Sequence, residues 1–342
     1  MTDTTTEYSR QDWQSDQEVR WCPGCGDYTI LAAVQNFMAE LDIKKEEVVF
    51  ISGIGCASRF PYYMNTFGMH SIHGRAPAIA SGLAVARPDL SVWVVTGDGD
   101  ALSIGGNHVI HALRRNINIK VLLFNNQIYG LTKGQYSPTS EQGKRTTSSP
   151  WGSIDRPFNP ISLALGTEAT FVARTIDIDR PHTQEMLRRA YEHKGSAFIE
   201  IYQNCNVFND KAFIKLTGRE ERDINRIDLE HGQPVVFGPG NEWGVVMDRG
   251  AARIVDVAAV GIDKIHVHDA HADSPAAAFA LTRLSHNPIG PTPVGVFREV
   301  SRPLYETTLQ QQIHDAQASR GPGDLARLVA STGTWTVEGD GR

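Results

Sequence analysis

The stretch that decides the fold is Ser91-Val-Trp-Val-Val-Thr-Gly-Asp-Gly99, followed along the chain by Ile119-Lys-Val-Leu-Leu-Phe-Asn-Asn126. Each begins as a short, nearly continuous apolar run rich in β-branched residues, which is typical of parallel strands buried on both faces. Between them, residues 104–115 carry apolar side chains at helical spacing, so the unit is predicted to be β-α-β. Parallel strands end at the same edge of a sheet, where open α/β sheets bind ligands. We therefore expect Asp98 and Asn126 to share one site.

The residue types in these two motifs suit a divalent cation bound to a diphosphate. Mg²⁺ takes oxygen ligands and usually bridges a protein carboxylate to substrate phosphates. Asp98 can supply the carboxylate, Asn126 an amide oxygen and Ile128 a backbone carbonyl. Gly97 and Gly99 let the backbone approach a diphosphate closely, because they lack a Cβ. A lone Gly-Asp-Gly is a common turn, but with the paired asparagines after the next strand it resembles the fingerprint of thiamine diphosphate enzymes.

The four cysteines of the chain carry a second signal: Cys22, Cys25, Cys56 and Cys205. A Cys-x-x-Cys pair with two distant single cysteines can converge on a four-thiolate site that holds an iron-sulfur cluster or zinc. The alternatives are reduced, partly buried thiols or a thioredoxin-like redox pair. A metal centre is favoured because Cys56 and Cys205 follow the predicted strands 47–52 and 197–202. Beside a thiamine site, a one-electron acceptor is useful, and a cluster fits this role whereas redox-inert zinc does not.

Further motifs occur in a fixed order between Trp21 and Asp210: Cys22-Pro-Gly-Cys-Gly26, Gly53-Ile-Gly-Cys56, His73-Gly-Arg-Ala76, Gly97-Asp-Gly-Asp100, Tyr129-Gly-Leu-Thr-Lys-Gly-Gln135 with Ser137-Pro-Thr139, and Cys205. In this order they resemble the β subunits of 2-oxoacid:ferredoxin oxidoreductases, most of all the two-subunit 2-oxoglutarate type. The resemblance implies an α/β fold with a doubly wound, mostly parallel sheet of the thiamine diphosphate (PP-domain) type. It also implies an N-terminal arm at 1–20, a cofactor and cluster domain at 21–210, and a C-terminal extension at 211–342 that packs on the core or a partner subunit.

The resemblance implies a reaction as well. We expect coenzyme A-dependent oxidative decarboxylation of 2-oxoglutarate to succinyl-CoA and CO₂, reversible in principle, with one-electron transfer from the thiamine adduct to one [4Fe-4S] cluster and on to ferredoxin. Pyruvate or a broad range of 2-oxoacids is the alternative, because nothing in the sequence places Arg75, Lys144 or Arg145 at a distal substrate carboxylate. A non-redox thiamine enzyme half and a zinc-stabilised scaffold subunit are the remaining alternatives.

Residue roles follow from the resemblance at the matching positions. Asp98, Asn126 and the Ile128 carbonyl would hold Mg²⁺, and the four cysteines would hold the cluster. His73 would hydrogen-bond the cofactor or its adduct and Lys133 would pair with the 2-oxoacid carboxylate; a surface histidine and a solvated lysine are the alternatives. The residues expected at the thiamine diphosphate are Ile54, Gly55, Cys56, Ala57, His73, Gly99, Asp100, Gly130, Leu131 and Thr132.

The chain also lacks a part that thiamine enzymes need. They activate the cofactor with a glutamate from a pyrimidine-binding domain, and no second α/β unit is predicted here. By resemblance this glutamate belongs to a larger α subunit, so we expect an α2β2 assembly. The net charge of −6 gives no reason to expect binding to nucleic acid or to an anionic membrane. Without a signal peptide or an apolar run of spanning length, the protein is expected to be cytoplasmic.

Outside the first β-α-β unit, the pattern predicts alternating helices and strands up to Asp210, where we expect the core to end. The helices are expected at 27–41, 76–87 and 182–194, and a short strand at 171–173; residues 138–160 read as a long polar loop. Beyond 210 the pattern is weaker. It favours strands at 235–237, 244–247 and 264–268, a helix at 276–284, and then an extended, proline-broken arm with a loose end.

Overall fold

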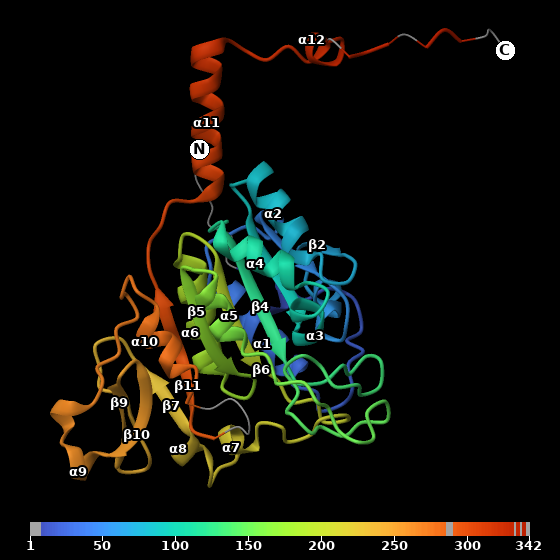
Figure 1. Cartoon of the computed structure of the whole chain (residues 1–342). Helices are drawn as coiled ribbons and strands as arrows, with labels where there is room; N and C mark the ends of the chain where they lie inside the picture. The colour runs from blue at the N-terminus through green and yellow to red at the C-terminus, as the bar shows by residue number, and fades with distance from the viewer. Residues whose placement is uncertain (1–7, 285–289, 332, 336, 340–342) are drawn as a thin grey trace.

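A computed structural model describes residues 8–284, 290–331, 333–335 and 337–339 (Figure 1). Its centre is an eight-stranded sheet in the order β2-β1-β3-β4-β6-β5-β11-β7. The strands are β1 Val48–Ser52, β2 Phe67–His70, β3 Ser91–Gly97, β4 Ile119–Asn125, β5 Phe171–Ile176, β6 Ala197–Tyr202, β7 Arg226–Leu229 and β11 Thr292–Glu299. Neighbouring strands from β2 to β5 are all parallel, and only β11 pairs antiparallel with β5. The predicted α/β fold with a mostly parallel sheet is confirmed.

The central strands are buried on both faces, as their apolar runs predict. Along β3, Val92 and Val94 pack into one hydrophobic cluster, whereas Trp93 and Val95 pack into the other. This alternation follows from the period of two along a strand. Helices cover both faces: α1 Asp27–Ala39 and α6 Arg180–Glu192 contribute to the second cluster, and α2 Ala76–Ala86, α4 Gly106–Arg114 and α5 Pro160–Gly166 to the first.

The direction in which successive strands are added to the sheet reverses between β1 and β3. The site predicted around Asp98 and Asn126 lies at this point. β1 pairs with β2 on one side and with β3 on the other, so the loops that follow β1 and β3 diverge from the same edge. Such a reversal leaves a crevice at the carboxyl ends of the strands, where open α/β sheets bind ligands. The short helix α3 Asp98–Leu102 begins there, directly after β3.

The main sheet extends past Asp210, contrary to the expectation that the core ends there. β11 pairs with β5, and β7 pairs with β11, so two strands from the C-terminal segment complete the sheet. β11 carries Pro293, Gly295 at a φ of 105° and a register shift between Val296 and Arg298. Proline, glycine and an irregular register are all signals against a strand, which explains why the sequence pattern predicts only an arm here.

A small antiparallel sheet is built from β8 Val236–Phe237, β9 Trp243–Asp248 and β10 Ala251–Asp256. The strands predicted at 235–237 and 244–247 correspond to β8 and β9. The strand predicted at 264–268 is wrong: η4 Ile262–Lys264 occupies its start, and Val267 forms only an isolated bridge to Pro234.

The remaining helices are short, apart from one. They are η1 Arg10–Trp13, η2 Lys45–Glu47, η3 Ala57–Tyr63, α7 Ile214–Thr217, α8 Arg222–Asn225, α9 Val257–Val260, α10 Ala276–Leu281 and α12 Leu325–Val329. The exception is α11 Tyr305–Arg320, which projects from the body at the end away from the carboxyl edge (Figure 1). None of the helices in the described part of the chain has the length and apolar character that a membrane span requires.

Candidate functional site

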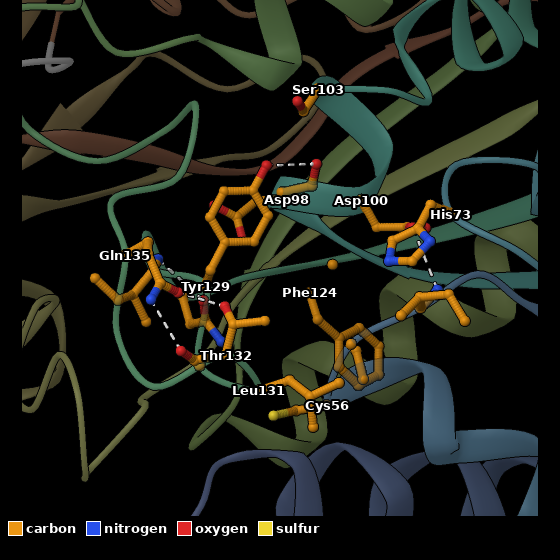
Figure 2. Close-up of a pocket in the computed structure, with 18 of the residues that line it drawn as sticks. Cys56, His73, Asp98, Asp100, Ser103, Phe124, Tyr129, Leu131, Thr132 and Gln135 are labelled. Atoms are coloured by element: carbon orange, nitrogen blue, oxygen red, sulfur yellow. Dashed lines mark hydrogen bonds between the residues drawn. The ribbon is translucent and has the colours of Figure 1, made fainter. Parts of the chain in front are cut away.

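A cavity of about 600 Å³ opens at the carboxyl ends of β1, β3 and β4 (Figure 2). All the residues predicted to contact thiamine diphosphate or Mg²⁺ line it: Ile54, Gly55, Cys56, Ala57, His73, Asp98, Gly99, Asp100, Asn126, Ile128, Gly130, Leu131 and Thr132. The lining also contains Gly97, which was expected to let the backbone approach a diphosphate, and residues to which the motifs gave no role: Ser103, Ile104, Phe124, Tyr129 and Gln135. The structure thus gathers the predicted set around one space, while the roles of its members stay predictions.

Asp98, the predicted carboxylate ligand, begins α3 and is only 2% exposed. Its Oδ2 accepts a hydrogen bond of 2.5 Å from Ser137 and lies 2.5 Å from Oγ1 of Thr139. Burial raises the pKa of Asp98 to about 6, because the hydroxyl contacts offset only part of the desolvation. A buried carboxylate that is fixed by two hydroxyl groups is suited to bind a cation. The Ser-Pro-Thr motif that supplies both hydroxyls was visible in the sequence, but without a structure it had no assignable role.

The two consecutive asparagines, Asn125 and Asn126, make different contacts. Asn125 points into the protein, where its Nδ2 donates to Glu200 at 2.7 Å. Glu200 is in turn paired with Arg174 at 2.7 Å, both side chains being almost fully buried. Asn126 instead lines the cavity, and its Oδ1 accepts a hydrogen bond of 3.2 Å from the backbone N–H of Ile128. This turn places the Asn126 amide and the Ile128 segment together, as expected for two ligands of one cation.

Gly99 is required by a close approach. A Cβ at this position would stand 2.1 Å from Cε1 of Tyr129. Tyr129 also donates from its hydroxyl to the backbone oxygen of Gly99 at 3.1 Å, a bond drawn in Figure 2. The Tyr129 ring therefore packs against the turn at Gly99 and stabilises it. Tyr129 lies in a loop, so the periodicity of the strands could not predict this contact.

Asp100 organises the cavity wall through backbone contacts. Its Oδ1 accepts from the N–H of Ile54 at 3.2 Å and from that of Gly74 at 2.7 Å, while Oδ2 accepts from Thr96 at 2.8 Å. These bonds fix the loop that delivers Cys56 and the loop that carries His73. Asp100 lines the cavity as predicted, and its oxygens are committed to holding both loops in place.

A second cavity, of about 220 Å³, is lined by all four cysteines. Two loops far apart in sequence are tied together to form it. The N–H of Gly26 donates to the Asn204 oxygen at 3.1 Å, and Asn206 Nδ2 donates to the Pro23 oxygen at 2.7 Å. Cys56 comes from the loop after β1, and its backbone oxygen accepts from the indole of Trp21 at 2.7 Å. The predicted convergence of the cysteines on one place is what the structure shows.

Burial keeps the thiols of Cys25 and Cys56 protonated in the absence of a positive centre. Desolvation raises the pKa of Cys56 to about 11 and that of Cys25 further still. Arg20, Arg59 and Lys133 also line this cavity and would compensate negative charge on a cluster of thiolates. Asp27 lies beside them, 1% exposed, with one carboxylate oxygen that has no hydrogen-bond partner.

The two cavities share a wall. Cys56, Asn126, Gly130 and Leu131 line both of them. A Cβ on Gly130 would lie 3.6 Å from the sulfur atoms of both Cys56 and Cys205. A single layer of residues therefore separates the space at Asp98 from the space at the thiols.

The two residues predicted to act on substrate occupy different places. His73 is exposed and lines the larger cavity. Lys133 lies in the same turn as Leu131 and Thr132 but lines the cysteine cavity rather than the larger one. Its position agrees with a role near a negatively charged cluster at least as well as with pairing to a 2-oxoacid carboxylate.

The raised pKa of Asp98 gives a pH dependence with a definite sign. Without metal, the folded chain keeps a proton that the unfolded chain releases, so the free energy of unfolding falls as the pH rises from the ordinary value of 3.8 to about 6. Below about pH 6, a cation must displace this proton. We expect the affinity for thiamine diphosphate at fixed Mg²⁺ to fall about tenfold per pH unit there. Calorimetric titrations at pH 5, 6 and 7 measure it, and equal affinities would contradict the expectation.

Comparison with known proteins agrees with this geometry. The family model described as "Thiamine pyrophosphate enzyme, C-terminal TPP binding domain" matches residues 53–201, a range that contains all the residues that line the larger cavity. Fold and site thus define the cofactor-binding unit of a thiamine pyrophosphate enzyme.

The relatives narrow this class. The chain is 58% identical to the 2-oxoglutarate oxidoreductase subunit KorB of Mycobacterium tuberculosis, over 96% of this chain and 88% of that protein. It is 45% identical to the 2-oxoacid:ferredoxin oxidoreductase subunit beta of Sulfolobus sp, over 64% of this chain and 72% of that protein. The chain belongs to the β subunits of the 2-oxoacid:ferredoxin oxidoreductases, as its motifs predict, and a β subunit implies an α partner.

A solved structure supports the same assignment. It is the 2-oxoglutarate:ferredoxin oxidoreductase from Magnetococcus marinus with 2-oxoglutarate, coenzyme A and succinyl-CoA bound. The match has a TM-score of 0.76 and 33% sequence identity, and it covers 96% of this chain and 97% of that one. The match therefore extends beyond residues 53–201 into the C-terminal segment.

Proposed function

We propose that this chain is the β subunit of a coenzyme A-dependent 2-oxoglutarate:ferredoxin oxidoreductase that converts 2-oxoglutarate to succinyl-CoA and CO₂. The observation that carries the proposal is the wall shared by the two cavities, because it sets a diphosphate site directly beside four thiols. The choice of 2-oxoglutarate rests on the Mycobacterium tuberculosis relative and on the ligands of the Magnetococcus marinus structure. Pyruvate or a broad range of 2-oxoacids is the alternative.

The donor set of the larger cavity fits magnesium and thiamine diphosphate. Asp98, Asn126 and the Ile128 carbonyl are oxygen ligands of the kind that Mg²⁺ selects, and all three residues line one space. Thiamine diphosphate supplies the electron sink for decarboxylation when it is bound. The residues of this chain would hold its diphosphate through the cation, leave room for it at Gly99, and offer His73 as a hydrogen-bond partner for the cofactor or its adduct.

The cysteine cavity fits a [4Fe-4S] cluster better than zinc. A four-thiolate zinc site needs sulfurs about 3.8 Å apart, since each Zn–S bond is about 2.3 Å long in a tetrahedron. Among the described residues, no three His, Cys, Asp or Glu side chains are placed to hold a metal ion. The thiols nevertheless surround a common space of about 220 Å³, which suits a larger group bound through four separate irons.

The larger cavity also indicates what the α partner supplies. No glutamate is among the described residues that line it. The glutamate that activates thiamine diphosphate would therefore come from the α subunit. Ile104 and Leu131 line the cavity although they are 57% and 46% exposed, so a partner has apolar surface to cover there. We extend the proposal to an α2β2 assembly with ferredoxin as electron acceptor.

The proposal is tested on the α–β complex purified without oxygen. We expect brown protein with about four iron atoms per β subunit, and viologen reduction that requires both 2-oxoglutarate and coenzyme A. A panel of 2-oxoacids then tests the substrate, and the β subunit alone, which lacks the glutamate, should be nearly inactive. Colourless protein with one zinc would favour a scaffold subunit, whereas active protein without iron would favour a non-redox thiamine enzyme.

A further inference from the structure

Among the residues that the structure describes, Gln203 is the one whose side chain hydrogen-bonds both a predicted magnesium ligand and a predicted cluster ligand. It directly follows β6 and is 1% exposed. Its Oε1 accepts from Nδ2 of Asn126 at 2.8 Å. Its Nε2 donates toward the sulfur of Cys25 at 3.3 Å and to the backbone oxygen of Asn204 at 2.6 Å. No motif argument assigned this residue a role.

The orientation of both amides is fixed by backbone groups. Nε2 of Gln203 faces the Asn204 carbonyl, which can only accept, so the amino end points toward Cys25. Oδ1 of Asn126 faces the N–H of Ile128, which can only donate, so Nδ2 of Asn126 points toward Gln203. A flip of either amide would oppose two donors or two acceptors. The direction of the hydrogen bonds across the wall is therefore determined.

The sheet contact at this position does not depend on the side chain. The backbone N–H of Gln203 continues the sheet contact by donating to the Asn125 oxygen at 2.9 Å, whatever side chain is present. A buried amide that only filled space could be replaced by an apolar residue of the same shape. The Gln203 side chain instead uses its oxygen to accept from Asn126 and its amino group to donate to Cys25 and to the Asn204 backbone oxygen.

We infer that Gln203 is a positioning residue that tunes the cluster and orients the magnesium site at the same time. The inference rests on the proposed function. A hydrogen bond to a ligand sulfur stabilises the more negative, reduced state of a cluster, so the amide at Cys25 raises the reduction potential. The same amide fixes the Nδ2 end of Asn126, so that its Oδ1, which accepts from the Ile128 N–H, keeps a second lone pair for the cation. Gln203 would thus set the reduction potential of the cluster and hold the neighbouring magnesium site in place at the same time.

The first test is the reduction potential of the cluster, measured by titration monitored by electron paramagnetic resonance on the α–β holoenzyme. Gln203→Met keeps the length and burial but removes the donor at Cys25. We expect the ratio of reduced to oxidised cluster at a fixed ambient potential to fall about tenfold, which for one electron is 59 mV. Gln35→Met is the matched control and should leave the potential unchanged, because Gln35 is also a buried glutamine, donates to the Tyr63 oxygen at 3.2 Å and lines neither cavity.

The second test separates the two ends of the amide. Gln203→Glu keeps an oxygen to accept from Asn126, whereas Gln203→Met removes it. At fixed Mg²⁺, we expect calorimetry to show wild-type affinity for thiamine diphosphate in Gln203→Glu and about fivefold to tenfold weaker binding in Gln203→Met. If Gln203→Glu fails to assemble, Gln203→Met alone tests the contact to Asn126, and wild-type affinity in that variant would contradict the role at Asn126.

The outcomes distinguish this inference from the proposed function. An iron-free wild-type complex would overturn both. An iron-loaded wild type with the same potential in Gln203→Met would overturn the role at Cys25 alone, and equal affinities for thiamine diphosphate would overturn the role at Asn126 alone. A purely structural role predicts a lower unfolding temperature with neither the potential nor the affinity changed.

Discussion

Replacing Asp98 by asparagine should abolish Mg²⁺-dependent binding of thiamine diphosphate and lower kcat/KM for the 2-oxoacid by about 1,000-fold or more. Asparagine has nearly the same shape and still offers an oxygen to Ser137 and Thr139. It lacks the negative charge that a hard divalent cation requires. The expected loss of cofactor binding and activity therefore comes from the missing negative charge, because the loop that carries Ser137 and Thr139 keeps its contacts.

The same substitution should stabilise the chain when no metal is bound. Burial raises the pKa of Asp98 from 3.8 to about 6, so at pH 8 the ionised carboxylate destabilises the empty fold. Removing that charge should raise the free energy of unfolding by about 1–3 kcal/mol. Chemical denaturation at pH 8 in a chelator measures this gain, and it should vanish near pH 4, where the wild-type carboxyl is also neutral.

A matched variant separates this effect from a general loss of charge. Asp155→Asn removes an exposed carboxylate that accepts from Tyr136 and does not line either cavity. It should leave activity and stability close to those of the wild type. An Asp98→Asn complex that still bound thiamine diphosphate with normal magnesium dependence would remove Asp98 from the ligand set.

The sequence was most informative where a motif and a strand end coincide. Asp98 and Asn126 are fixed in space once β3 and β4 are recognised as parallel neighbours, because the pleat and the hydrogen-bond ladder then set both strand ends. Cys56 and Cys205 follow in the same way from β1 and β6. Local periodicity thus predicted the sheet edge, whereas most of the residues that line it were predicted from the resemblance of the motifs to a known family.

Contacts that depend on irregular backbone could not be predicted in this way. Tyr129 reaches Gly99, and Ser137 reaches Asp98, across loops whose paths no periodicity specifies. The two loops of the cysteine cavity are joined by side chain to backbone bonds such as Asn206 to Pro23. The pairing of β11 with β5 spans more than a hundred residues and runs against the proline and glycine in β11. These features need the tertiary structure, because their partners are distant in sequence.

Replacing Cys205 by alanine should remove the cluster while leaving the thiamine site occupied. Cys205 lines only the cysteine cavity, whereas Cys56 lines both. We therefore expect Cys205→Ala to lose nearly all iron and to reduce viologen about 1,000-fold more slowly, because the first electron acceptor is absent. Its affinity for thiamine diphosphate should stay within about threefold of the wild-type value. Iron analysis, anaerobic assays and calorimetry on the α–β complex measure these three quantities.

Cys56→Ala provides the contrast that decides how tightly the two sites are joined. This cysteine belongs to the loop that Asp100 holds through the N–H of Ile54, and it forms part of the shared wall. Its loss should remove the cluster and also weaken thiamine diphosphate binding by about tenfold, because the cavity lining changes. If both variants lost cofactor affinity equally, the cluster itself would be needed to shape the larger cavity. If both kept full viologen reduction, electrons would leave the thiamine site by a route that avoids the cysteines, and the shared wall would have no part in the reaction.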